Sequence, residues 1–127
     1  MDPAPPWGNN RGVQVLDPNT VLDRKQLRDV TLDDSDLMRE LLDTLVSDTA
    51  AQLALLDQAI RDQDGQRTAR LAHYCKGACA NMGANAMATL LKRLELDAAA
   101  GKFSEAEICY AGLPAQLERL RLEAQSL

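Results

Sequence analysis

Residues 33–61 read DDSDLMRELLDTLVSDTAAQLALLDQAIR, and this stretch decides the fold class. Its apolar residues recur every three or four positions, which is the period of a helix with one buried face. Asp33, Asp34 and Asp36 at its start suit the positive end of a helix dipole. The pattern predicts one long amphipathic helix. Two overlapping apolar stripes are expected along it. The first consists of Leu37, Leu41 and Leu45, and the second of Met38, Leu42, Leu45, Thr49, Leu53, Leu56 and Ile60.

Helical patterns continue on both sides of this segment. We expect a short helix over residues 23–30 and longer helices over residues 66–82 and 84–100. Gly83 and Gly101 stand just beyond the two longer helices, where a glycine commonly ends a helix. The connections between these segments are therefore short.

The last helix is expected to follow Ser104-Glu105-Ala106-Glu107, which has the form of a capping box. Pro114 should kink or split it, because proline lacks the backbone N–H that a helix interior needs. Four substantial helices with short connections favour an all-α, up-down antiparallel four-helix bundle with a short extra N-terminal helix. The core positions expected in the last helix are Ile108, Leu113, Leu117, Leu120 and Ala124.

The composition agrees with a helical fold. The 127 residues include 21 Leu and 19 Ala but only 7 Val and Ile together, and aromatic residues make up 3%. Strands favour β-branched and aromatic residues, so a β-rich fold is excluded. The length fits one domain, which we place at residues 21–127. Residues 1–20, rich in Pro, Gly and Asn and containing Trp7, are expected to form a flexible tail.

Charge and hydropathy exclude other classes of protein. The net charge of −5 argues against a general nucleic-acid binder, and no run of about 18 apolar residues predicts a membrane span. The first ten residues do not resemble a signal peptide, so we expect a cytoplasmic protein. In that compartment the three cysteines are expected to be reduced and buried thiols.

The single histidine, His73, stands on an unusual helix face. A helical wheel of about 100° per residue gathers Leu71, Cys75, Ala78 and Met82 into a buried stripe opposite His73. The residues on the side of His73 are small, apart from one lysine, so the imidazole is expected to be exposed. These neighbours are Ala69, Lys76, Gly77 and Ala80.

The surroundings of His73 are expected to be basic. Residues 65–94 contain no Asp or Glu but five basic residues, which favours binding of a phosphoryl group and of an acidic partner. Gly77 lies one turn after His73, although a glycine inside a helix costs about 0.5–1 kcal/mol relative to Ala. We expect it to leave room for a macromolecule to approach the ring. Lys76 places an ammonium group on the same side.

These residues resemble a family signature. His73-x-x-Lys76-Gly77, then Gly83-Ala84, then Leu91-x-x-Leu94-Glu95 is similar to the pattern of histidine-containing phosphotransfer (HPt) domains of multistep phosphorelays. The resemblance covers about residues 21–127. It implies that His73 is the phospho-acceptor, that Lys76 helps to bind the phosphoryl oxygens and that Gly77 provides access. Ala69, Arg70 and Ala80 then join Gly77 in partner docking.

The resemblance also implies the partners. These are the receiver domain of a hybrid sensor histidine kinase, which supplies the phosphoryl group, and that of a response regulator, which accepts it. The chain is expected to be a monomeric phosphocarrier without kinase activity of its own, and to need neither nucleic acid nor membrane. No cofactor is expected, because Mg²⁺ should come with the receiver.

Two other interpretations remain. Cys75 and Cys79, joined by Cys109, would be candidate metal ligands, but His73 and Cys75 point about 160° apart on the wheel, which leaves no compact His/Cys site. The alternative function is a non-phosphorylated helical adaptor that binds receiver or kinase domains. Phosphate uptake on His73 distinguishes a carrier from an adaptor.

Overall fold

The computed structural model describes residues 17–127, and every regular element in this part of the chain is a helix. The prediction of an all-α protein is confirmed. Trp7 and most of the expected tail lie outside the described residues. The helices are α2 (Arg24–Val30), α3 (Ser35–Arg61), α4 (Gly65–Asn81), α5 (Asn85–Ala99), α6 (Phe103–Ala111) and α7 (Leu113–Gln125).

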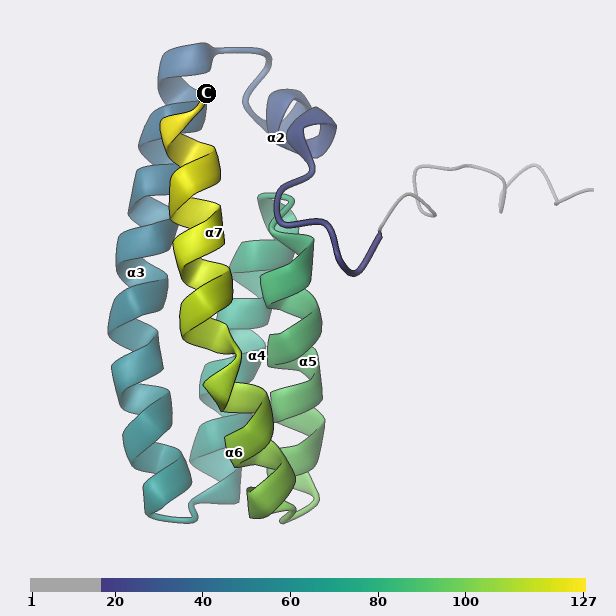
Figure 1. The fold of residues 1–127 in the computed structure, drawn as a ribbon, viewed down its shortest axis with the longest axis vertical. Helices are drawn as coiled ribbons and strands as arrows, with labels where there is room; N and C mark the ends of the chain where they lie inside the picture. The colour runs from purple at the N-terminus through teal and green to yellow at the C-terminus, as the bar shows by residue number, and fades with distance from the viewer. Residues whose placement is uncertain (1–16) are drawn as a thin grey trace, which may run out of the picture.

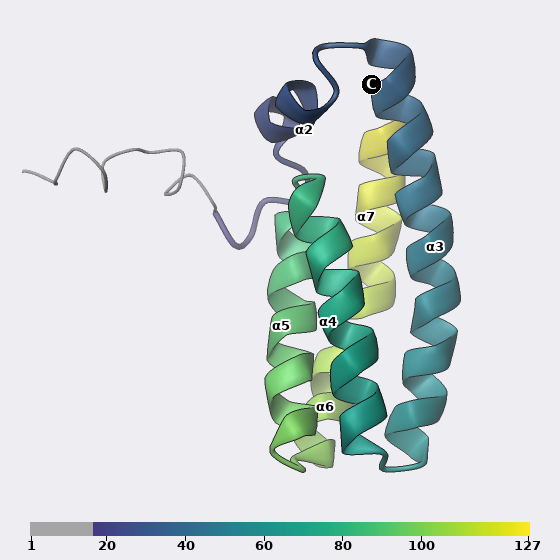
Figure 2. The ribbon, with the colours of Figure 1, turned by 180° about the vertical axis from the view of Figure 1, so that it is seen from behind.

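The long helices form a bundle. Helices α3, α4 and α5 lie along the long axis of the molecule, and α6 continues into α7 to complete the bundle (Figure 1). The chain direction alternates from α3 to α4 to α5 and again to α6 (Figure 1). Seen from behind, α4 and α5 lie side by side, and α2 sits at the end of the bundle near the turn that joins them (Figure 2).

Aspartate side chains start three of the helices. Asp23, Asp34 and Asp64 are the N-caps of α2, α3 and α4, and each accepts a hydrogen bond from a backbone N–H three residues later, at 3.0–3.1 Å. Such caps pair N–H groups that have no partner inside the helix, and each contributes about 1 kcal/mol. The expected stops are also present, because Gly83 (φ +84°) and Gly101 (φ +75°) adopt the left-handed conformation just past α4 and α5.

The core confirms the second stripe predicted for α3, since all seven of its positions are buried, whereas Leu37 and Leu41 of the first stripe are only half-buried. The three cysteines are free and buried as well. From the other helices the most buried large side chains are Leu27, Met87, Leu91, Leu94, Leu113 and Leu120.

Two predictions for the last helical segment are wrong. The N-cap of α6 is Lys102, so Ser104 already lies inside the helix and no side chain caps this end. Ile108, predicted as a core residue, is 75% exposed, whereas Ala106 and Cys109 are buried. The reason is the break at Gly112, which with Pro114 makes α6 and α7 separate helices, as predicted for the proline. The apolar phase of α7 therefore does not extend back into α6.

The buried face of α4 also differs from the prediction. Cys75 is buried as expected, but the other buried residues are Thr68, Ala72 and Cys79. Leu71, Ala78 and Met82, which were predicted in the stripe, only pack at the edge of the core. The buried arc is thus turned by about 60° on the helical wheel. The physical reason is that α4 packs against both α3 and α5, and its small residues let α5 lie close.

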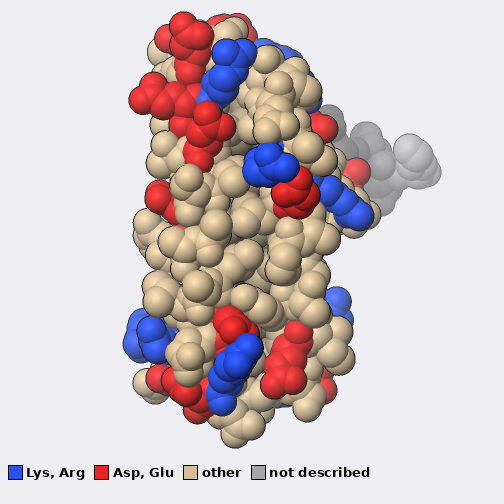
Figure 3. Space-filling model, turned by 60° about the vertical axis from the view of Figure 1, so that its left-hand side comes forward, with Lys and Arg blue, Asp and Glu red and all other residues tan. Residues whose placement is uncertain are grey.

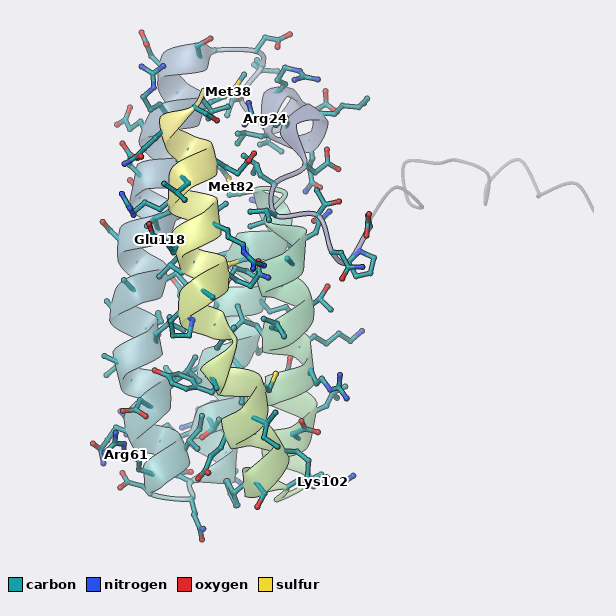
Figure 4. The ribbon with its side chains drawn as sticks, in the orientation of Figure 1. Arg24, Met38, Arg61, Met82, Lys102 and Glu118 are labelled. Atoms are coloured by element: carbon teal, nitrogen blue, oxygen red, sulfur yellow. The ribbon has the colours of Figure 1, made fainter. Side chains whose placement is uncertain are left out.

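Charges of both signs are distributed over the surface. In the view of Figure 3, acidic and basic side chains gather toward the two ends of the molecule, and a band of uncharged side chains crosses the middle. Ion pairs within single helices include Arg61–Asp57 on α3 and Arg121–Glu118 on α7, and Figure 4 labels Arg61 and Glu118. No helix in the described part of the chain is long and apolar enough to span a bilayer.

Candidate functional site around His73

The imidazole of His73 lies on the surface in the middle of α4. Its side chain is 66% exposed, as the sequence predicts. One turn later, a Cβ atom built on Gly77 would meet no heavy atom of the surrounding structure within 4 Å. Gly77 is therefore not needed for close helix packing. It leaves open space beside the ring.

A carboxylate from the neighbouring helix holds the imidazole. Glu95 of α5 places Oε2 2.9 Å from Nδ1 of His73 and Oε1 3.1 Å from Nζ of Lys76. The Lys76 ammonium group also lies 3.3 Å from His73 Nδ1. The Lys76 and Glu95 side chains are only 26% and 23% exposed, so this His73–Lys76–Glu95 cluster is partly shielded from water on the side of α5.

The expectation of acid-free surroundings for His73 is wrong. Residues 65–94 contain no Asp or Glu, but the next residue is Glu95, and the packing of α5 beside α4 brings it to the imidazole. Sequence distance misled here, because His73 and Glu95 are 22 residues apart along the chain. The signal for this contact was the Leu-x-x-Leu-Glu pattern, in which Glu95 directly follows the apolar Leu94.

The cluster keeps Glu95 ionised. Partial burial opposes ionisation, but the hydrogen bonds from Lys76 and His73 outweigh it, so the pKa of Glu95 lies below its ordinary value. A neutral imidazole carries one N–H, and a carboxylate accepts it. When Nδ1 donates its proton to Glu95, Nε2 is left with a free lone pair. Glu95 lies nearer to Nδ1 (2.9 Å) than the Lys76 ammonium group does (3.3 Å), so the contacts favour the tautomer that leaves the Nε2 lone pair free.

The remaining predicted residues lie on both sides of His73 along α4. Arg70 is exposed, whereas Ala69 is partly buried in a hollow formed with Ala98 of α5. Ala80 is exposed, and its carbonyl oxygen accepts a hydrogen bond from Gln26 Nε2 of α2 at 2.6 Å. The helix therefore brings Arg70 and Ala80 to the surface, while α5 partly covers Ala69.

The thiols of α4 are buried. Burial raises the pKa of Cys75 to about 11 and that of Cys79 to about 12, so both are protonated at neutral pH. Within residues 17–127, no group of three or more His, Cys, Asp or Glu side chains is placed to hold a metal ion.

Comparisons with known proteins identify the class. The model of the Hpt domain family matches residues 40–123, and the chain therefore belongs to this family. A solved relative is histidine-containing phosphotransfer protein B (HptB) from Pseudomonas aeruginosa PAO1, whose crystal structure superimposes with a TM-score of 0.77 at 29% identity. The match covers 84% of this chain and 92% of that protein. No curated protein matches the sequence. The resemblance read from the sequence is confirmed.

Proposed function

We propose that His73 carries the phosphoryl group in a phosphorelay, taking it from the aspartate of one receiver domain and passing it to the aspartate of another. Family membership supports a histidine phosphotransfer role. One observation carries the assignment to this residue: His73 is exposed and lies within hydrogen-bond distance of an ionised carboxylate through Nδ1. That arrangement leaves Nε2 free to attack.

The transfer step follows from this tautomer. The Nε2 lone pair attacks the phosphorus of the receiver's acyl phosphate, an N–P bond forms, and the P–O bond to the aspartate carboxylate breaks. The imidazole gains positive charge as the bond forms, because Nδ1 keeps its proton. Glu95, 2.9 Å from Nδ1, stabilises that charge. The second transfer runs the same step in reverse.

We propose that Lys76 neutralises the phosphoryl oxygens. Its ammonium group is bonded to Glu95 and lies 3.3 Å from Nδ1, so it is already beside the ring. The flexible lysine stem allows it to turn toward a phosphoryl group on Nε2. Phosphoryl transfer depends on such charge neutralisation and on in-line approach. The open space at Gly77 supports that approach.

The receivers are proposed to be those of a hybrid sensor histidine kinase and of a response regulator. They would dock over the exposed part of α4, with Arg70 and Ala80 on either side of His73 and Ala69 at the edge. We propose a monomeric, cytoplasmic carrier without kinase activity, which takes no cofactor because Mg²⁺ enters with the receiver. Residues 21–127 would then form an up-down antiparallel four-helix bundle in which α6 and α7 together make the fourth column.

Phosphate uptake tests the carrier function. A panel of receiver domains is charged with acetyl phosphate and mixed with wild type and with His73→Gln. Wild type should acquire acid-labile, alkali-stable phosphate, and His73→Gln should acquire none. The proposal fails if wild type takes up no label from any receiver, or if His73→Gln is labelled. Absence of label on wild type would favour the alternative function, a non-phosphorylated adaptor.

The role of Glu95 has its own test. Glu95→Gln removes the charge that favours the reactive tautomer but keeps the side-chain shape. Transfer to His73 should slow about tenfold, which is about 1.4 kcal/mol of lost transition-state stabilisation. Nitrogen-15 NMR of the imidazole should show the shift from the Nδ1–H toward the Nε2–H tautomer. Unchanged rate and tautomer would show that Glu95 only packs against the ring.

A further inference from the structure

A hollow of about 510 Å³ lies between α5 and α6. Leu90 of α5 and Ile108 and Cys109 of α6 line it with apolar groups. Ile108, which was predicted as a core residue, is 75% exposed beside this hollow, whereas Cys109 is buried. The surface here combines an apolar hollow with a large exposed aliphatic side chain, and no residue of the His73–Lys76–Glu95 cluster belongs to it.

Charges of both signs border the hollow. Two come from α5, one from the turn after it, where Figure 4 labels Lys102, and one from α6. These residues are Arg93, Asp97, Lys102 and Glu105. None of the four forms an ion pair within residues 17–127. Because two cations and two anions give no preference for a ligand of one sign, the border suits a surface that also carries both signs.

Arg93 and Asp97 are spaced so that two copies of α5 complement each other. The two residues are four positions apart, which is about 6 Å along the helix axis and about one turn, so both lie on the same side of α5. When a second copy lays its α5 antiparallel across this surface, each Arg93 faces the Asp97 of the other copy. A two-fold axis repeats every contact in this way, and Ile108 lies beside that axis.

The hollow lies on the far side of α5 from the His73 site. Glu95 contacts His73 of α4, whereas Arg93 and Asp97 border the hollow at α6. Each of these two residues is two positions from Glu95, which is about 160° around the helix axis. A molecule bound at the hollow therefore leaves the imidazole uncovered.

We propose that the α5–α6 surface pairs two copies of this chain around a two-fold axis. Ile108 of each copy enters the hollow of the other, and Arg93 of each copy pairs with Asp97 of the other. One hollow and its border bury little area, so the dissociation constant should be on the order of 100 µM. The chain is then a monomer at micromolar concentration, as proposed above, and pairs where it is concentrated. This inference does not depend on the phosphotransfer function.

Sedimentation velocity tests the pairing. At low salt, wild type should pass from monomer toward dimer between about 10 µM and about 1 mM. Ile108→Asp should raise the dissociation constant more than about tenfold, because it places two like charges beside the axis. Its fold should hold, since the side chain is 75% exposed, and circular dichroism checks this. The control is Leu122→Asp, which makes the same kind of change at an exposed position of α7 and should leave the dissociation constant unchanged.

Charge exchange tests the two-fold arrangement. Arg93→Glu alone and Asp97→Arg alone should each remain monomeric, because either change places like charges opposite each other at both symmetric contacts. Mixed in equal amounts, the two variants should pair with each other, because every new side chain then faces an opposite charge. The affinity of the mixed pair should lie within about threefold of wild type.

Each other outcome overturns a stated part of the proposal. Wild type that stays monomeric at the highest concentration overturns the pairing itself. Ile108→Asp that pairs as well as wild type places the contact elsewhere on the surface. A mixture of Arg93→Glu and Asp97→Arg that stays monomeric overturns the antiparallel arrangement of α5. Phosphate uptake on His73 is measured separately, and its absence would leave these results unaffected.

Discussion

The two faces of α4 carry different kinds of residue: the inner face packs into the core, and the outer face exposes His73. The inner face carries Thr68, Ala72, Cys75 and Cys79, all buried between α3 and α5. The outer face carries an exposed imidazole, and next to it Gly77, where an added Cβ would touch nothing. Nucleophilic side chains stand on both faces. Burial keeps the thiols of the inner face protonated, whereas the imidazole of the outer face is exposed and has a carboxylate partner at Nδ1.

The largest expected contrast comes from placing the same carboxylate on each face. Ala72 is fully buried, so Ala72→Asp should destabilise the protein by more than about 3 kcal/mol, because an unpaired charge enters the core. Ala80 is exposed, so Ala80→Asp should cost no more than about 1 kcal/mol. Urea unfolding measures both. Equal losses of stability would contradict the division between the faces.

The thiols of the inner face provide the second contrast. A pKa of about 11 for Cys75, against an ordinary 9.0, cuts the thiolate fraction at pH 8 about a hundredfold, and the pKa of about 12 for Cys79 cuts it further. Both thiols should react with a disulfide reagent at least about a hundred times more slowly in the folded protein than in guanidinium chloride. Rapid labelling of the folded protein, with mass-spectrometric assignment to either residue, would show that this face opens.

Gly77 sharpens the description of the outer face. Gly77→Ala should stabilise the protein by about 0.5–1 kcal/mol, since the new methyl meets nothing and helix propensity improves. Gly77→Gln should keep the fold but slow phosphotransfer about tenfold, about 1.4 kcal/mol, by obstructing the approach to His73. Thermal unfolding measures the stability of Gly77→Ala, and transfer of the phosphate label measures the rate for Gly77→Gln. Unchanged transfer in Gly77→Gln would remove the access role.

The smallest expected effect is on the pH dependence of stability, through the Glu95 carboxylate between α4 and α5. Because folding lowers the pKa of Glu95, its contribution to stability is present above the unfolded value near 4.5 and is lost as pH falls through the folded value. Glu95→Gln should thus be less stable than wild type near pH 7, by less than about 1 kcal/mol, and the gap should close in strong acid. Denaturant titrations in a His73→Gln background keep imidazole protonation out of the comparison. A stability difference between the two proteins that stays constant with pH would show that ionised Glu95 does not stabilise the fold.

The sequence predicts features that depend on periodicity or on local chain geometry. The buried stripe of α3, the glycine stops after α4 and α5, the break at Pro114 and the exposure of His73 all belong to this kind. Each depends on residues close together in the chain, where spacing fixes which face a side chain occupies. These features were enough to predict the bundle and the exposed histidine.

Features that depend on how two helices meet were predicted wrongly. A single-helix wheel assumes one partner, so it placed Leu71 and Met82 in the stripe of α4 and missed Ala72. The same limit hid Glu95, which reaches His73 only because α4 and α5 pack side by side. Ile108 was misplaced because a helix break resets the apolar phase. In each case the missing information was the geometry of a second element.

Lys76 has a single ammonium group, yet it lies 3.1 Å from Glu95 Oε1 and 3.3 Å from His73 Nδ1. Under the proposed function, a phosphoryl group on His73 would draw on the same positive charge that now ties α4 to Glu95 of α5. Whatever the phosphoryl group gains from Lys76, the contact between the two helices would lose, so loading the carrier and loosening this contact would be two sides of one equilibrium.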